Sequence, residues 1–367
     1  MPESSRQPNV LVAGLWTWAY HQEAAARALE ALGCSVTRFS YFDDLLTWSD
    51  QKKVPVARSA WRRLQRRLEW GPALWRINLR LRRVAVQAHP DVFFFYNTAS
   101  IFPSTLRAIR RRLPGAALCQ YANDDPFSDK ARYLRWRHFL RCVPLCDTHY
   151  AFRPQNLEDY RAHGARRVHL LRAYYIPEED RPLEPSQIEP RFQCDVVFAG
   201  HYENDARVEM LEDIARAGFR LNIFGAMWEQ ALPRLASDSP LRALYPIRSA
   251  LGDQYRQAIC GAKIALCFLS TLNRDTYTRR NFQIPAMGTM MLSQRTDDLA
   301  TLFREGIEAE FFCDRGELLA KVRRYVADAP RRRAVAQAGQ DRVRQDGHDV
   351  VSRMRFFLET CRSGFRT

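Results

Sequence analysis

Short apolar runs alternate with longer amphipathic segments along most of this 367-residue chain. The first apolar run, N-V-L-V-A-G at 9–14, precedes an alanine-rich segment at 22–32 and a second apolar run at 35–42. Short runs bounded by Gly and Pro predict buried strands, and the longer segments between them predict helices. This alternation is typical of α/β domains with parallel sheets.

The alternation stops once and then restarts, which predicts two domains. Residues 176–190 contain four prolines and five acidic residues, a composition that predicts a linker. We therefore expect a Rossmann-like N-terminal domain at 1–175, a second domain at 191–349 and a last helix within 350–367. The predicted strands are 9–14, 35–42, 91–96, 116–121, 148–152 and 167–172 in the first domain and 195–199, 220–224, 264–269, 289–292 and 309–312 in the second.

The stretch 263–288 combines the features of a ligand-binding edge. An apolar run leads into a polar loop, which ends at two adjacent cations, Arg279 and Arg280, before N-F-Q-I-P-A-M-G starts a helix. In α/β sheets such loops build a crevice at the carboxyl ends of the strands, where arginines meet anions such as phosphate. An ordinary surface loop with solvated arginines is the alternative, and these residues alone leave both interpretations open.

The pattern R-x-F-[E/Q]-I-P-A-x-G-x-x-[ML]-L at 280–292 resembles the donor-site signature of GT-B glycosyltransferases, in the CgeB-like (spore-maturation-like) branch of family 1. The resemblance continues at 198–207, 223–228 and 305–312, with a weaker match at 121–127. It implies an α/β protein of GT-B fold, with two Rossmann-like domains facing across a cleft and a last helix that crosses back to the first. The second domain would bind a nucleotide sugar and the first an acceptor.

The resemblance also implies a set of donor-binding residues. The loop after the first strand of the second domain approaches the donor phosphates in related enzymes, which points to Gly200 and His201. Arg280, helped by Arg279 or Lys263, would neutralise the leaving diphosphate without a metal. Lys263 has a structural alternative as a residue at the end of a helix.

Two positions concern the acidic residues of the family pattern. Many retaining members carry a glutamate five residues before the glycine and another acidic residue eight positions earlier; here these are Gln283 and Asp275. By resemblance, the residue at 283 contacts the nucleotide ribose, and the residue at 275 contacts the donor sugar or its phosphate region. An amide can hydrogen-bond to hydroxyls but supplies no charge. The retaining or inverting outcome therefore stays open, and a non-catalytic nucleotide-sugar or glycan-binding protein is the alternative function.

Further carboxylates are candidates for acceptor chemistry. Asp124 and Asp125 follow the predicted strand 116–121, where a base or a ligand for sugar hydroxyls would lie. A turn closed by an Asp side chain is the alternative. Glu308, just before the strand 309–312, is a candidate sugar or acceptor contact or a residue of a solvated face.

The net charge of +15 is concentrated in one segment, 52–83, which holds eleven cations and a single acid, Glu69. Within it, Trp61 and the leucines at 64 and 68 share one helical face. A basic helix with such a face can lie in a membrane interface, although solvated arginines on a packed helix are the alternative. The predicted membrane or acceptor face comprises Trp61, Arg62, Arg63, Arg66 and Arg67.

Other functions lack a signal. The first glycine loop has no G-x-G-x-x-G, so no dinucleotide cofactor is expected, and no acidic cluster suggests a metal. Zinc, RNP and KH signatures are missing, so nucleic acid is not a predicted partner. Nine scattered cysteines, no signal-peptide pattern and no apolar run of roughly 18 residues predict a cytoplasmic protein. The basic face within 52–83 would place it on the inner face of the plasma membrane as a peripheral protein. The predicted function is transfer of a sugar to a glycan or lipid-linked acceptor, in bacterial surface polysaccharide or lipopolysaccharide synthesis.

Overall fold

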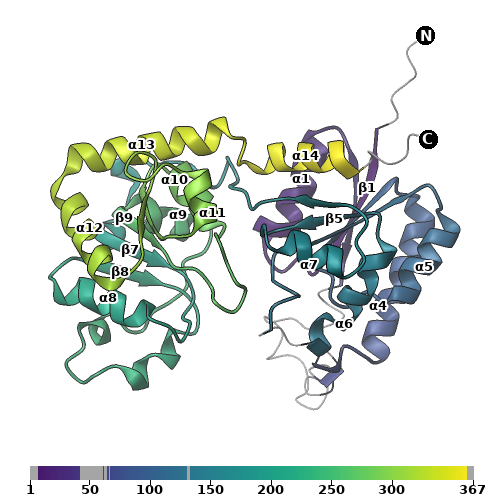
Figure 1. The fold of residues 1–367 in the computed structure, drawn as a ribbon, viewed down its shortest axis with the longest axis horizontal. Coiled ribbons are helices and arrows are strands. Elements are labelled where there is room, and N and C mark those ends of the chain that lie inside the picture. The colour runs from purple at the N-terminus through teal and green to yellow at the C-terminus, as the bar shows by residue number, and fades with distance from the viewer. Residues whose placement is uncertain (1–6, 42–60, 62–63, 66, 130–132, 362–367) are drawn as a thin grey trace, which may run out of the picture. The chain divides into compact units, whose positions relative to one another are not determined.

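The chain forms two compact units, each built on one parallel sheet (Figure 1). The first unit runs through Arg172 and includes the chain from Val350 onward, and the second comprises Ala173–Asp349. The computed structural model describes residues 7–41, 61, 64–65, 67–129 and 133–361.

The first unit contains a six-stranded sheet in the order β2-β1-β3-β4-β5-β6. Its strands are β1 (Asn9–Gly14), β2 (Ser35–Ser40), β3 (Val92–Tyr96), β4 (Ala117–Ala122), β5 (Thr148–Ala151) and β6 (Val168–Leu170). Its helices are α1 (Ala24–Ala31), α4 (Pro72–Ala88), α5 (Pro103–Arg112), α6 (Tyr133–Cys142), α7 (Asn156–Ala162) and α14 (Val350–Cys361). A π-helical turn at Ala19–Glu23 replaces the start of the helix predicted at 22–32.

Strand β3 shows why this sheet needs helices on both faces. Every residue of V-F-F-F-Y is buried, as expected for a parallel strand covered on two sides. Phe93 and Phe95 pack in a cluster with Leu81 of α4. Phe94 instead contacts Phe357 of α14, with ring centroids 4.4 Å apart. The last helix of the chain is therefore part of the core of the first unit.

The second unit contains a five-stranded sheet in the order β11-β10-β9-β7-β8. Its strands are β7 (Cys194–Ala199), β8 (Leu221–Phe224), β9 (Ala262–Cys267), β10 (Met290–Gln294) and β11 (Glu310–Phe312). Its helices are α8 (Arg207–Arg216), α9 (Asp253–Cys260), α10 (Arg280–Ala286), α11 (Asp297–Leu302), α12 (Arg315–Ala327) and α13 (Ala329–Gln345). All eleven predicted strands are confirmed, with ends that differ by no more than two residues.

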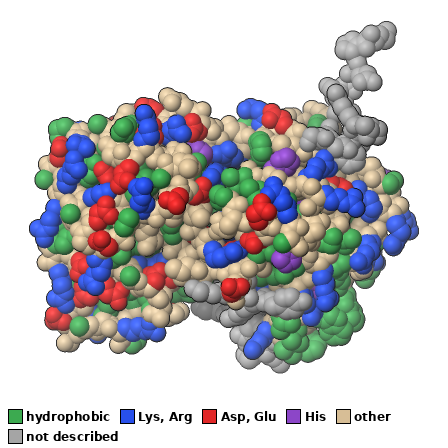
Figure 2. All heavy atoms as spheres, viewed as in Figure 1, with side chains coloured by type: hydrophobic (Ala, Val, Ile, Leu, Met, Phe, Trp, Pro, Cys, Tyr) green, Lys and Arg blue, Asp and Glu red, His purple; other side chains and the backbone are tan. Residues whose placement is uncertain are grey.

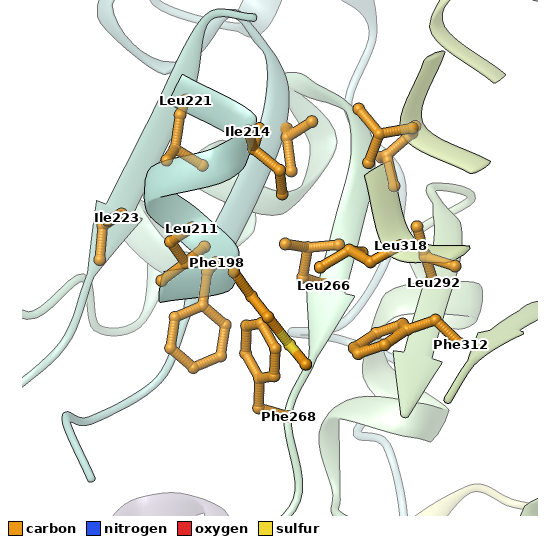
Figure 3. Packing of buried hydrophobic residues seen from close by; sticks show 14 of the residues in the cluster. Phe198, Leu211, Ile214, Leu221, Ile223, Leu266, Phe268, Leu292, Phe312 and Leu318 are labelled. Carbon is orange, nitrogen blue, oxygen red and sulfur yellow. The ribbon is translucent and has the colours of Figure 1, made fainter. Parts of the chain in front are cut away.

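The core of the second unit links its strands to the helices that cover them (Figure 3). The labelled side chains come from strands β7 to β11, the segment just after β9, and helices α8 and α12: Phe198, Leu211, Ile214, Leu221, Ile223, Leu266, Phe268, Leu292, Phe312 and Leu318. Phe268 lies just past β9 and packs edge-on against Phe198 and Phe312, with ring centroids 4.9 and 5.7 Å apart. Packing of this kind anchors the start of the loop that follows β9.

Candidate functional site

The loops after β7, β9 and β10 leave the same edge of the second sheet. These strands are parallel neighbours, so their last residues, Ala199, Cys267 and Gln294, lie along one edge. Hydrogen bonds connect the loops: the Leu269 N–H donates to Gln294 Oε1 at 2.7 Å, and Arg207 Nη2 donates to the Leu269 carbonyl at 3.4 Å. This edge is where open α/β sheets bind ligands.

The predicted phosphate-loop residue Gly200 lies at this edge, directly after β7. A Cβ on Gly225, in the loop after β8, would lie 1.9 Å from the Gly200 carbonyl oxygen. The same oxygen accepts a hydrogen bond from the Trp228 indole at 3.0 Å, while the Gly200 N–H donates to the Phe224 carbonyl at 2.8 Å. The close approach explains the glycine in I-F-G-A-M-W and fixes the backbone of the loop after β7.

His201 and Glu203 form a hydrogen-bonded pair in this loop, with Nε2 and Oε1 2.9 Å apart. The side chains are 48% and 7% exposed, so the imidazole meets solvent in front of a buried carboxylate. Arg207, itself buried, lies 3.5 Å from the other carboxylate oxygen. Burial alone would raise the pKa of Glu203, but hydrogen bonds from His201 and Ser270 and the charge of Arg207 hold this pKa below its ordinary value. His201 is therefore oriented at the edge by an ionised partner.

A buried network determines where Arg280 begins α10. Asn281 is fully buried; its Oδ1 accepts from the Thr278 N–H at 2.7 Å, and its Nδ2 donates to Ser293 Oγ at 3.0 Å. The Arg280 N–H donates to Thr278 Oγ1 at 3.1 Å. Because Ser293 belongs to β10, the position of Arg280 is tied to the sheet. Asp275 lies in the preceding loop, half-buried, and its N–H donates to the Ser270 carbonyl at 2.9 Å.

Arg280 carries an incompletely satisfied guanidinium at the end of β9. Its Nε is buried and has no hydrogen-bond partner, and within the described parts of the chain no carboxylate forms an ion pair with it. Burial raises the pKa of the Cys267 thiol to about 12, against the opposing effect of the neighbouring Arg280. A buried donor without a partner is costly, and a charged one more so. An anion bound here would relieve that cost.

Gln283 and Arg279 both contact a residue that the sequence assigns to the linker, Asp180. Gln283 Nε2 donates to Asp180 Oδ1 at 2.8 Å, and Arg279 Nη2 lies 3.4 Å from Asp180 Oδ2. The Asp180 side chain is only 4% exposed. The Tyr255 hydroxyl donates to Gln283 Oε1 at 3.4 Å, and the Arg279 guanidinium lies over the Tyr174 ring. What distinguishes the two arginines is this ion pair: Arg279 has a carboxylate partner in Asp180, whereas Arg280 has none among the described residues.

The structure separates two of the predicted donor residues from this edge. Lys263 is the second residue of β9 because the strand starts at Ala262, and its Nζ pairs with Asp195 Oδ1 at 2.7 Å near the start of β7. Glu308 precedes β11 and accepts from the Arg304 backbone N–H at 2.8 Å and from its guanidinium. In a parallel sheet, residues at or just before the start of a strand lie at the amino edge, opposite to the carboxyl edge described above. Lys263 and Glu308 therefore do not join the other donor residues.

Three residues at the carboxyl edge were not predicted from the sequence: Asp180, Glu203 and Asn281. Glu203 stands two positions after His201 in the stretch that resembles a donor loop, and this spacing was an available signal. Asp180 lies 103 positions before Gln283, and nothing local marks it among the other acids of its segment.

In the first unit, the adjacent Asp124 and Asp125 follow β4 but differ in environment. Asp125 is 2% exposed, and its Oδ1 accepts from the Phe127 N–H at 3.0 Å and from Asn156 Nδ2 at 3.1 Å. Asp124 has a 36% exposed side chain and pairs with Arg135 at 3.0 Å. The contacts of Asp125 match the predicted turn, whereas Asp124 remains accessible to a ligand.

The predicted membrane face is described only in part, because Arg62, Arg63 and Arg66 lie outside the described residues. Arg67 is exposed, and hydrophobic side chains gather beside α4 (Figure 2). Six large ones, each 42–54% exposed, lie on α4 or the segment before it: Trp61, Leu64, Leu68, Trp70, Trp75 and Leu79. The opposite face of α4 is buried in the core. This helix therefore presents a second, outward apolar stripe, next to the exposed Arg76 and Arg83.

Comparison with known proteins identifies the fold. Residues 207–359 match the Glycosyl transferase-like family, whereas no curated protein sequence matches the chain. Anabaena HepE, solved in complex with UDP-glucose, has a TM-score of 0.66 and 13% identity over 96% of this chain and 98% of that one. Sucrose-phosphate synthase from Thermosynechococcus elongatus has a TM-score of 0.67 and 12% identity over 96% and 98%. A glycosyltransferase from Rickettsia africae has a TM-score of 0.63 and 10% identity over 97% and 98%. The predicted GT-B fold is thereby confirmed.

Among the described residues, no group of three or more His, Cys, Asp or Glu side chains is arranged to hold a metal ion. No helix in the described ranges has both the length and the apolar character needed to cross a membrane.

Proposed function

We propose that this chain is a glycosyltransferase that moves a sugar from a nucleotide-sugar donor to a glycan or lipid-linked acceptor. The match of residues 207–359 to the Glycosyl transferase-like family supports the reaction class. The GT-B fold supports a donor site in the second unit, since one structural neighbour, Anabaena HepE, was solved both with UDP-glucose and with UDP. The resemblance of 280–292 to the CgeB-like branch points the same way.

The observation that carries the proposal is the state of Arg280. Its guanidinium lies at the carboxyl end of β9 with a buried, unpartnered Nε. The loop with Gly200 and His201 leaves the neighbouring strand at the same edge. Transfer of the sugar leaves negative charge on the departing diphosphate, and a fixed cation at that point stabilises it. We assign this task to Arg280, assisted by His201, without a metal ion.

The remaining predicted residues have separate tasks in this proposal. Gln283 contacts the ribose, and Asp275 contacts the donor sugar from the loop after β9. In the first unit, Asp124 serves as the base that receives the acceptor hydroxyl proton or as a ligand for acceptor hydroxyls. Asp125 is assigned to the fold, because its buried carboxylate closes the turn at Phe127.

A lipid-linked acceptor would lie at the inner face of the plasma membrane, and the exposed side of α4 is suited to that surface. Trp75 and Leu79 form an apolar stripe beside the cations Arg76 and Arg83. Tryptophan and arginine together favour the interface of an anionic bilayer. We therefore propose peripheral docking through α4, in the synthesis of a bacterial surface polysaccharide or lipopolysaccharide.

A panel of nucleotide sugars, screened by thermal shift, tests the proposal. A donor that binds the native state raises the melting temperature by mass action. Its turnover, or its slow hydrolysis in the absence of acceptor, is then measured by release of the nucleoside diphosphate, before and after dialysis against EDTA. We expect one donor to stabilise the protein and to release diphosphate in both conditions. Binding without any release would favour a non-catalytic nucleotide-sugar-binding protein, and loss of activity in EDTA would contradict the metal-independent assignment.

A further inference from the structure

Position 283 carries an amide, and this amide contacts the carboxylate of Asp180. The Asp180 side chain is almost completely buried, and its two oxygens serve different groups. Oδ1 accepts from Gln283 Nε2 at 2.8 Å, while Oδ2 accepts from the Ile176 N–H at 2.8 Å and lies 3.4 Å from Arg279 Nη2. An ionised carboxylate can only accept hydrogen bonds. The Gln283 amide must therefore direct its nitrogen toward Asp180.

This constraint determines what Gln283 can offer to a ligand. With Nε2 committed to Asp180, Oε1 receives one hydrogen bond, from the Tyr255 hydroxyl at 3.4 Å. A carbonyl oxygen has two lone pairs, so Oε1 retains one as an acceptor. The side chain is only half-buried. A ribose hydroxyl can therefore donate to Oε1 as it would to a carboxylate oxygen.

We propose that Asp180 is a positioning residue of the donor site, which orients the Gln283 amide so that its oxygen accepts from a ribose hydroxyl. The proposal rests on the donor-binding function assigned above. It explains why glutamine is suited to position 283, because a glutamate there would bring two carboxylates together. It also assigns a role to the segment 174–182, which reaches α10 through Asp180 and through Tyr174 beneath Arg279.

The carboxylate and the amide of Asp180 and Gln283 can be exchanged by substitution. Restored binding in the double variant would show a specific contact, because damage to the fold by the single substitutions would not be reversed by combining them. In Asp180→Asn, the new amide oxygen can still accept from the Ile176 N–H, so its nitrogen faces Gln283. Gln283 then has to turn over and loses its outward acceptor. In Gln283→Glu, two carboxylates meet and one is forced to hold a proton. In the double variant, the introduced glutamate accepts from the nitrogen of the introduced asparagine and still presents an oxygen to the ribose.

Two measurements on the full chain test the proposal. Calorimetry first identifies which of UDP, GDP and ADP binds the parent most tightly, and then compares it with its 2′-deoxy counterpart. Asp180→Asn should weaken binding of the ribonucleotide by about three- to tenfold, which corresponds to the loss of one hydrogen bond. Binding of the 2′-deoxynucleotide should change much less. The double variant should regain the parent preference. Melting temperature, which needs no ligand, should fall in Gln283→Glu, more at pH 8 than at pH 5, and recover in the double variant.

Glu179→Gln is the matched control, because it removes a neighbouring but exposed carboxylate; it should change neither measurement. If Asp180→Asn lost affinity equally for the ribonucleotide and the deoxynucleotide, or if the double variant did not regain the preference for the ribonucleotide, the role of Asp180 would be overturned. The proposed donor-binding function would still stand. If none of the three diphosphates bound the parent, donor binding itself would fail and the ligand role of Asp180 with it. An unchanged melting temperature in Gln283→Glu would separately contradict the contact.

Discussion

A cation lies near each end of strand β9, and the two cations are in opposite states: Lys263 belongs to the start of the strand, whereas Arg280 begins α10 and lies beside Cys267 at the strand's end. At the amino end, Lys263 pairs with Asp195 at 2.7 Å. At the carboxyl end, Arg280 has a buried Nε without a partner and no ion pair to a carboxylate of the described chain. The difference indicates that Lys263 stabilises the fold, whereas Arg280 is available to an external anion.

The same contrast separates residues that are adjacent in the sequence. Arg279 meets Asp180, but Arg280 does not; Asp125 is closed into a turn, but Asp124 remains accessible. A charged side chain whose hydrogen-bonding groups are all satisfied by other parts of the protein is assigned a structural role. One that is held in place yet incompletely satisfied is a candidate for a ligand. The Asp124 and Asp125 variants and the Arg280 and Lys263 variants below test this contrast directly.

The largest expected effect concerns Asp124 and Asp125. Asp124→Asn should lower turnover by roughly a hundredfold or more, because it removes the proposed base, and should leave donor affinity nearly unchanged. Asp125→Asn should instead lower the melting temperature, because its carboxylate accepts two hydrogen bonds in a buried turn. Steady-state kinetics at saturating donor and thermal unfolding of both variants test this. Full turnover in Asp124→Asn would exclude it as the base.

The arrangement of the sheets was accessible from the sequence. Apolar runs such as V-F-F-F-Y identify buried strands because parallel strands are covered on both faces. Gly200 and Gly225 also marked the ends of β7 and β8, where the two loops approach each other closely. Lys263 lies at the amino end of β9 whether the strand starts at 264, as predicted, or at Ala262, as observed. Its position relative to the strand therefore already argued against a place at this site, and its ion pair with Asp195 agrees with that.

A smaller effect is expected for membrane docking through α4. Replacement of Arg76 and Arg83 by Gln should weaken binding to vesicles of phosphatidylglycerol and phosphatidylcholine by about 2 kcal/mol, or roughly thirtyfold, since each charge near an anionic surface contributes about 1 kcal/mol. The control, Arg323→Gln with Arg331→Gln, removes two exposed cations from α12 and α13 of the second unit. Co-sedimentation measures the binding. Equal losses in the two double variants would indicate a general charge effect and contradict docking through α4.

The smallest effect is the pH dependence contributed by Glu203. Its pKa is held below the ordinary value of 4.5 in the folded state. A lowered folded pKa stabilises the protein above the unfolded pKa, and this stabilisation is lost as the pH falls through the folded pKa. Glu203→Gln should therefore reduce the free energy of unfolding by about 1 to 2 kcal/mol near pH 7. The deficit should shrink below about pH 4.5, as urea unfolding at several pH values would reveal. A deficit independent of pH would contradict the ionised pair.

The contacts of the donor site were less accessible from the sequence than its location. Arg279 and Arg280 are equivalent in the sequence, and only the position of Asp180 distinguishes them. That residue reaches α10 from 103 positions away and comes from a segment whose prolines and acids resemble an ordinary linker. Sequence patterns of period 2 or 3.6 report local burial. They carry no information on which distant carboxylate neutralises which arginine.

The most direct test of the donor site is calorimetric titration of a nucleoside diphosphate into Arg280→Ala and Lys263→Ala, the two ends of β9. Because Arg280, and not Lys263, is assigned to the diphosphate, its loss should weaken diphosphate binding by roughly 1.5 to 3 kcal/mol, while binding of the free nucleoside changes much less. Lys263→Ala should bind the diphosphate as the parent does, at a temperature where both variants remain folded. Parent-like affinity in Arg280→Ala, or an equal loss in Lys263→Ala, would contradict the assignment of the donor site to the carboxyl end of this strand.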